Sequence, residues 1–281
     1  MLTALSVRIP EKSEGLKKWV DKLRRDKVEI QINRARGVSL RHITYTSYSG
    51  EVRLDRADRL IGAQRTQLLC SEKLVFPHKS GYHRFSSRSF SARLCTNMAL
   101  EVLRECQCAA QLRLCVYDPH AVAADFVLHA LQYCVNPVVV TDKTDIYTLT
   151  RNRALEELGA GLTLTESRAK IGKYDLIVAP SGVEDTIHFA PDAVVLTTGN
   201  PDGAAGGNIY HGYRFRMPNG FDSIKPKELS EEYFCSALYT LGSQFELGSI
   251  VPLSCVGGAS SQTVKSLANL LDIHCKKEYN N

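Results

Sequence analysis

The chain has 281 residues, of which 44% are hydrophobic and 23% are charged, so it can bury a substantial core and is long enough for two domains. No apolar run approaches the roughly 20 residues of a membrane-spanning helix, and the apolar part of the N-terminus is too short for a secretory signal. We therefore expect a cytoplasmic protein that does not enter a membrane.

The charge is distributed unevenly along the chain. Residues 1–110 carry 21 Lys and Arg against 11 Asp and Glu, whereas residues 111–281 carry 14 against 19. A basic half can serve an anionic ligand, a nucleic acid or the acidic half of the same chain. Because the sequence has no zinc-finger spacing, ribonucleoprotein signature or recognisable helix-turn-helix, nucleic acid is not the favoured partner.

The first 107 residues predict a basic α+β domain. An amphipathic helix is expected over 13–26, and the alternating segments 28–32 and 40–46 are typical of strands. The segment 89–106 has apolar residues at helical spacing, which predicts a buried helix that links this domain to the next.

From residue 108 the sequence alternates between strands and helices. Short apolar strands are expected over 112–118, 137–142, 162–167, 174–182 and 193–200, with helices over 120–134 and 146–161. This alternation favours a parallel sheet covered on both faces, so residues 108–225 predict a Rossmann-like, doubly wound α/β domain. Residues 226–281 add helices over 228–245 and 261–275, which we expect to pack back on the N-terminal domain.

The nine cysteines lie mostly in apolar segments and predict reduced core thiols rather than disulfides. The closest pair, Cys106 and Cys108, has a single residue between the thiols, which is poor spacing for structural zinc. Since no second pair with ligand spacing follows, we expect no metal site.

The run YDLIVAPSGVEDTIHFAPDAVVLTTGNPD, residues 174–202, resembles the second half of the nucleotide domain in two-domain Rossmann dehydrogenases such as the folate and shikimate dehydrogenases. In those families a strand ending in a small-residue turn leads to a strand ending in glycine. The resemblance implies that two turns face the nicotinamide of a dinucleotide: Ser181 and Gly182 in the first, and Thr198, Gly199 and Asn200 in the second.

The first strand-to-helix turn, where a dinucleotide site needs Gly-x-Gly-x-x-Gly, instead reads Asp-Pro-His-Ala-Val-Ala from residue 118 to 123. Asp118 is a suitable N-cap for the following helix, and Pro119 suits the first helical position. A capping carboxylate would occupy the backbone donors and repel a diphosphate at the same helix end. NAD or NADP is therefore a possible cofactor but not the favoured one.

Two further residues of this region are candidates. Asp142 ends the second strand, 24 residues after Asp118, where a Rossmann acid would receive the ribose hydroxyls, although acids are also ordinary at strand ends before helices. His120 is the nearest candidate for proton transfer, and its alternative interpretation is an exposed histidine of the first helical turn.

A basic patch precedes the helix expected over 89–106. It interleaves Arg84, Arg88 and Arg93 with serines, and arginines near a helix start are suited to an anion such as phosphate. A solvated loop with serine caps is the alternative.

The first functional interpretation is a Rossmann-like protein with a degenerate dinucleotide site, which binds a small molecule between its domains or acts as a regulatory protein. The alternative is an NAD(P)-dependent oxidoreductase with a divergent phosphate turn. A third class is a binder of nucleic acid or an acidic partner through the basic half. Enzymatic activity and oligomeric state stay open.

Overall fold

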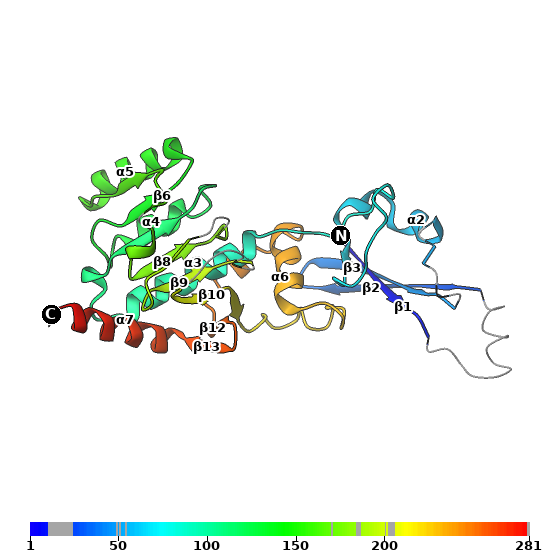
Figure 1. Cartoon of the computed structure of the whole chain (residues 1–281). Coiled ribbons are helices and arrows are strands. Elements are labelled where there is room, and N and C mark those ends of the chain that lie inside the picture. The colour runs from blue at the N-terminus through cyan, green and yellow to red at the C-terminus, as the bar shows by residue number, and fades with distance from the viewer. Residues whose placement is uncertain are drawn as a thin grey trace. The chain divides into compact units, whose positions relative to one another are not determined.

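The computed structural model describes residues 1–10, 25–48, 50, 52–53, 55–169, 171–183, 187–199, 201 and 206–279 (Figure 1). The helix expected over 13–26 lies almost entirely outside these residues. The chain forms two compact units, one of Met1–Ser87 with Met217–Leu247 and one of Arg88–Arg216 with Gly248–Asn281. The helix that we expected to link the two domains thus belongs to the second unit.

The first unit is built on a four-stranded sheet of order β2-β3-β1-β4. Its strands are β1 (Leu2–Arg8), β2 (Lys27–Ala35), β3 (Val38–Thr46) and β4 (Leu69–Cys70). β1 pairs in parallel with β3 and β4, whereas β2 runs antiparallel to β3. The strands β2 and β3 were predicted, but β1 was not. The unit also contains α2 (Asp55–Ile61), η1 (Gly62–Gln67) and α6 (Glu231–Thr240).

The second unit is built on a six-stranded parallel sheet of order β10-β9-β8-β5-β6-β7. When β5 to β10 are renumbered 1 to 6 and the sheet is read from β7, the strand order is 3-2-1-4-5-6. This is the strand order of the Rossmann fold. The predicted Rossmann-like domain is therefore confirmed. Its strands are β5 (Leu114–Tyr117), β6 (Val138–Val140), β7 (Thr163–Thr165), β8 (Leu176–Ala179), β9 (Val194–Thr197) and β10 (Asn208–Tyr210).

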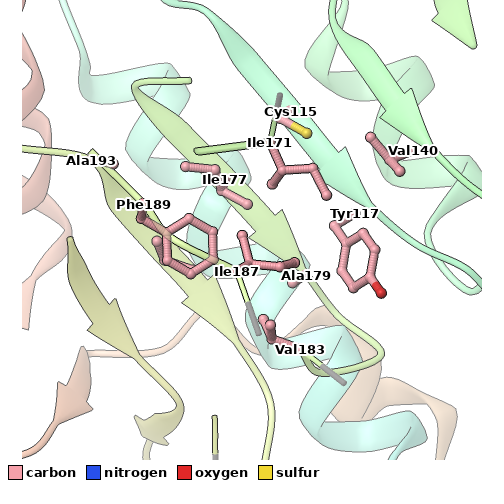
Figure 2. Close-up of a cluster of buried hydrophobic side chains, with 11 residues drawn as sticks. Cys115, Tyr117, Val140, Ile171, Ile177, Ala179, Val183, Ile187, Phe189 and Ala193 are labelled. Carbon is pink, nitrogen blue, oxygen red and sulfur yellow. The ribbon is translucent and has the colours of Figure 1, made fainter. Parts of the chain in front are cut away.

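The central strands of this sheet are buried on both faces, because every residue of β5, β8 and β9 is buried. Helices α4 (Ala124–Ala130) and α5 (Thr144–Leu158) connect β5, β6 and β7. Helix α3 (Ser89–Glu105) contacts β8 and β9. Figure 2 shows an apolar cluster in which Ile171 of a short helix and the loop residues Val183 and Phe189 pack with side chains of the strands. The described residues between β8 and β9 form no α-helix, so an irregular segment contributes to this covering.

The C-terminal part of the chain divides between the units. Helix α6 lies in the first unit, where the Tyr233 hydroxyl donates to the Phe85 carbonyl at 3.0 Å. Helix α7 (Val264–Tyr279) belongs to the second unit, where it packs against α3. The second unit also holds a three-stranded sheet of β11 (Gly212–Arg214), β12 (Ser254–Gly257) and β13 (Ser260–Thr263). The short helices are η2 (Ala109–Gln111), η3 (Ile171–Lys173) and η4 (Phe245–Ser249).

Candidate functional site

The candidate site lies at the carboxyl ends of β5 and β8, which are neighbours in the sheet although β6 and β7 separate them in the chain. In open α/β sheets a ligand binds at such a point, where the strand order reverses. Asp118 directly follows β5, and Ser181 follows β8 by two residues. The topology thus places two of the predicted site residues together.

Asp118 is fully buried, and its carboxylate is held by donors from three segments of the chain. Oδ1 accepts a hydrogen bond from Ser181 Oγ at 3.0 Å. Oδ2 accepts from the Tyr147 hydroxyl and from the Ala123 backbone N–H, each at 2.7 Å. These hydrogen bonds offset the cost of burying the carboxylate, and they hold it in one orientation. We call Asp118, Tyr147, Ser181 and Ala123 the Asp118 network.

Tyr147 was missing from the candidates that sequence reasoning selected. It lies on α5 and is fully buried, and a buried tyrosine hydroxyl needs a polar partner. Burial raises its pKa, and the nearby Asp118 carboxylate raises the pKa further, so the hydroxyl stays protonated and donates. The available signal was a tyrosine on the apolar face of a helix that follows the second strand.

The start of helix α4 differs from the prediction. The helix begins at Ala124 rather than beside Pro119, and its N-cap is Ala123. Between Asp118 and Ala123 the chain makes a turn in which the Ala121 N–H donates to the Asp118 carbonyl at 3.3 Å and Ala121 has a φ of 57°. The Asp118 side chain nevertheless occupies the Ala123 N–H, which is a backbone donor that a ligand phosphate would use.

The turns after β8 and β9 lie against each other. Gly182 has a φ of 96°, and a Cβ atom there would lie 3.3 Å from the Thr198 carbonyl oxygen. The Thr198 hydroxyl donates to the Pro180 carbonyl at 2.9 Å. The close approach explains why glycine follows Ser181. Gly199 also has a positive φ, of 70°, but its Cβ position is open.

Arg88 reaches this region from the N-cap position of α3. Its Nη1 donates to the Ser181 carbonyl at 3.4 Å, and the residue is exposed. A guanidinium has several N–H donors, so this contact uses only part of its capacity. Arg88 therefore places a positive charge beside the turn that contributes Ser181 to the Asp118 network.

Asp142 follows β6 and is exposed at the same edge of the sheet. Its Oδ2 lies 3.2 Å from Arg168 Nη2, and 54% of the Asp142 side chain is exposed. The guanidinium of Arg168 also lies 5.8 Å from the centre of the Tyr117 ring. The carboxylate is accessible, in contrast to that of Asp118.

The remaining predicted residues are His120, Arg84, Arg93 and Asn200. His120 is exposed. Arg84 belongs to the first unit, where it donates to the Cys70 carbonyl at 3.0 Å and lies 3.9 Å from the Tyr233 ring centre. Arg93 is half-buried on α3, and Asn200 lies outside the described residues.

Comparisons with known proteins give distant structural similarities. No protein-family model and no curated protein sequence matches this chain. The structure of Δ1-pyrroline-2-carboxylate reductase from Thermococcus litoralis, in complex with NADH and L-proline, is 11% identical and aligns over 73% of this chain and 70% of its own, with a TM-score of 0.31. L-tryptophan dehydrogenase from Nostoc punctiforme is 8% identical and aligns over 99% of this chain and 83% of its own, with a TM-score of 0.29. The fold assignment itself rests on the strand order of the sheet.

No helix among the described residues combines the length and the apolar character needed to cross a membrane.

Proposed function

We propose that this protein uses its Rossmann-like unit to bind a small anionic molecule beside Arg88, and that the site has lost the usual mode of dinucleotide binding. The observation that carries the proposal is the Asp118 network. A carboxylate stands at the end of β5, where a dinucleotide site has glycine, and it uses the Ala123 N–H. The first turn therefore presents negative charge and fewer donors to a pyrophosphate.

Helix α4 adds to this argument. It has only seven residues, and Asp125 lies in its first turn. A short helix contributes a weak dipole at its N-terminus, and an acidic side chain there opposes an incoming anion. The pyrophosphate of a dinucleotide would meet two carboxylates, those of Asp118 and Asp125, close to the same helix end.

Arg88 supports a smaller ligand. Its exposed guanidinium can pair with a single carboxylate or phosphate, whereas the buried Asp118 carboxylate is satisfied internally and needs no ligand. At Gly182 the backbone passes close to the Thr198 carbonyl oxygen and to the Arg88 guanidinium. A compact anion can bind there without displacing the Asp118 network.

The experiment is a thermal-shift screen of the full chain against inorganic phosphate, sulfate, small mono- and dicarboxylates and sugar phosphates. A ligand should raise the melting temperature of the wild type, and Arg88→Gln should reduce the shift. Lys173→Gln, a change outside the Asp118 network, is the matched control for loss of one positive charge. No shift with any of these anions, or an equal shift in Arg88→Gln, would count against the proposal.

Asp142 favours a second function, that of an NAD(P)-dependent oxidoreductase with a divergent phosphate turn. Its exposed carboxylate follows the second strand of the Rossmann order, where such enzymes bind the ribose hydroxyls. Arg168, 3.2 Å away, supplies a cation suited to a 2′-phosphate. Saturable binding of NADH or NADPH would give this function precedence over the first.

A further inference from the structure

We propose that Cys106, Cys108, Asp272 and Cys275 bind a thiophilic divalent cation of the zinc class. The four residues come from two places in the second unit. Cys106 and Cys108 lie just after helix α3, and Asp272 and Cys275 lie on helix α7, which packs against α3. This site is independent of the proposed anion site at the sheet edge.

The distances among three of the side chains suit one metal ion. The Sγ atoms of Cys106 and Cys108 are 3.6 Å apart, and Cys106 Sγ lies 3.1 Å from Asp272 Oδ1. The ligand atoms of these three residues all lie within 4.8 Å of one another. Two thiolates bound to one tetrahedral zinc ion at about 2.3 Å each are about 3.8 Å apart. Small side-chain rotations are therefore enough to bring these ligands around an ion.

Cys275 supplies the fourth donor. It follows Asp272 by three residues on α7, so both side chains lie on the same face of the helix. Cys275 lines the same cavity as Cys108 and Asp272, which places its thiol at the proposed site. Three thiolates and one carboxylate make a closed, four-coordinate site of the structural zinc type.

The surroundings permit an ion to enter and to be held. The cavity of about 350 Å³ is also lined by Gln107, Gln111 and Lys276. Cys106, Asp272 and Cys275 are buried, whereas Cys108 is partly exposed and borders the opening. The Lys276 ammonium offsets part of the excess negative charge of three thiolates and a carboxylate around a divalent cation. Thiolate ligands favour zinc over the oxygen-preferring cations magnesium and calcium.

Three of the four ligands, those of Cys106, Cys108 and Asp272, are already gathered before an ion binds. Asp272 Oδ1 accepts hydrogen bonds from the Cys108 N–H at 3.0 Å and from the Cys106 thiol, so the carboxylate is held beside both sulfurs. Binding of the ion would release the three thiol protons to solvent and keep this arrangement. Because Cys106 and Asp272 are 166 residues apart in the chain, the ion would cross-link the end of α3 to α7.

The test is titration of the reduced, chelator-treated full chain with Co²⁺, which reports thiolate ligation by a charge-transfer absorption band. We expect the band to saturate at one equivalent and to disappear when Zn²⁺ is added, and Zn²⁺ to raise the melting temperature. Cys108→Ser and Cys275→Ser should each weaken Co²⁺ binding by about 100-fold or more. Cys134→Ser, which removes a buried thiol that is not among the proposed ligands, should bind as the wild type does.

The titration of the wild type can overturn the proposal by itself, so the test does not require the variants to fold. A wild type without a saturating thiolate band, or a band lost equally in Cys134→Ser, contradicts the site. As a second measurement, Zn²⁺ should slow alkylation of Cys108, which borders the cavity. An unchanged alkylation rate at saturating Zn²⁺ would likewise exclude it.

Discussion

The hydroxyl of Ser181 donates a 3.0 Å hydrogen bond to the buried carboxylate of Asp118. This bond joins the carboxyl ends of β8 and β5, the two strands that meet where the order of the sheet reverses. With Tyr147 as a second side-chain donor, the Asp118 carboxylate ties together three segments of the Rossmann-like unit. The network is therefore expected to matter for stability whatever ligand the unit binds.

Asp118→Ala should destabilise the protein strongly. The change leaves the Tyr147 hydroxyl, the Ser181 hydroxyl and the Ala123 N–H without their acceptor in a buried place, which we expect to cost about 3 to 5 kcal/mol. Chemical denaturation of the full chain, followed by far-UV circular dichroism, measures the loss.

Asp118→Asn is the matched control for the same position. Its amide oxygen can still accept from Tyr147 and Ala123, and the Ser181 hydroxyl can rotate to accept from the amide N–H₂. The expected cost is about 1 kcal/mol. Equal losses for the alanine and asparagine variants would show that acceptance of these hydrogen bonds is not what stabilises the site.

Gly182→Ala and Gly199→Ala form a second matched pair. Both glycines have a positive φ, but a Cβ at Gly182 meets the Thr198 carbonyl oxygen at 3.3 Å, whereas the Cβ position at Gly199 is open. Gly199→Ala should cost about 1 kcal/mol from backbone strain, and Gly182→Ala about 2 to 3 kcal/mol. Thermal melts of the two variants compare them, and a larger loss at Gly199 would contradict the close packing of the turns.

Alkaline pH should destabilise the fold through its buried thiols. Burial raises the pKa of Cys134 from 9.0 to about 12, and it does the same for Cys235. Above pH 9 the unfolded chain loses thiol protons that the folded chain keeps, so the free energy of unfolding falls as pH rises toward 12. Each such thiol contributes a slope of about 1.4 kcal/mol per pH unit where it is ionised only in the unfolded chain.

Cys134→Ala measures the contribution of one buried thiol to this loss of stability at alkaline pH. Urea unfolding of the reduced protein between pH 8 and 11 should give a variant whose stability falls less steeply than that of the wild type, by about 1.4 kcal/mol per pH unit above pH 10. Comparison of slopes cancels the packing cost of the substitution, which is the same at every pH. Parallel pH profiles for the two proteins would be evidence against a buried, protonated Cys134.

The sequence predicts the Rossmann-like unit well because its signals are local. Apolar runs identified β5, β6, β7, β8 and β9 in the correct order, and helical spacing identified α3 and α5. The strand β1 was missed because its short run, LTALSVR, mixes apolar and small polar residues without clear alternation. The start of α4 was placed too early, since an aspartate followed by proline also fits the turn that the chain adopts.

The candidate site was predicted only in part because its partners are distant in the chain. Asp118 and Ser181 were each selected from local patterns, but they are 63 positions apart and nothing in the sequence indicated their contact. Tyr147 was overlooked because nothing local distinguishes a buried, hydrogen-bonded tyrosine from an apolar core residue. The same limit applies to Cys106 and Cys108, since spacing rules compare nearby cysteines and do not consider an acid and a thiol on a remote helix.

The most direct test of the central claim is a fluorescence titration of the wild type with NADH and with NADPH. Since the Asp118 carboxylate occupies a donor of the first turn, we predict no saturable change in nicotinamide fluorescence up to millimolar nucleotide. Saturable binding at micromolar concentration, weakened by Asp142→Ala, would contradict the loss of the dinucleotide site and establish the oxidoreductase interpretation in its place.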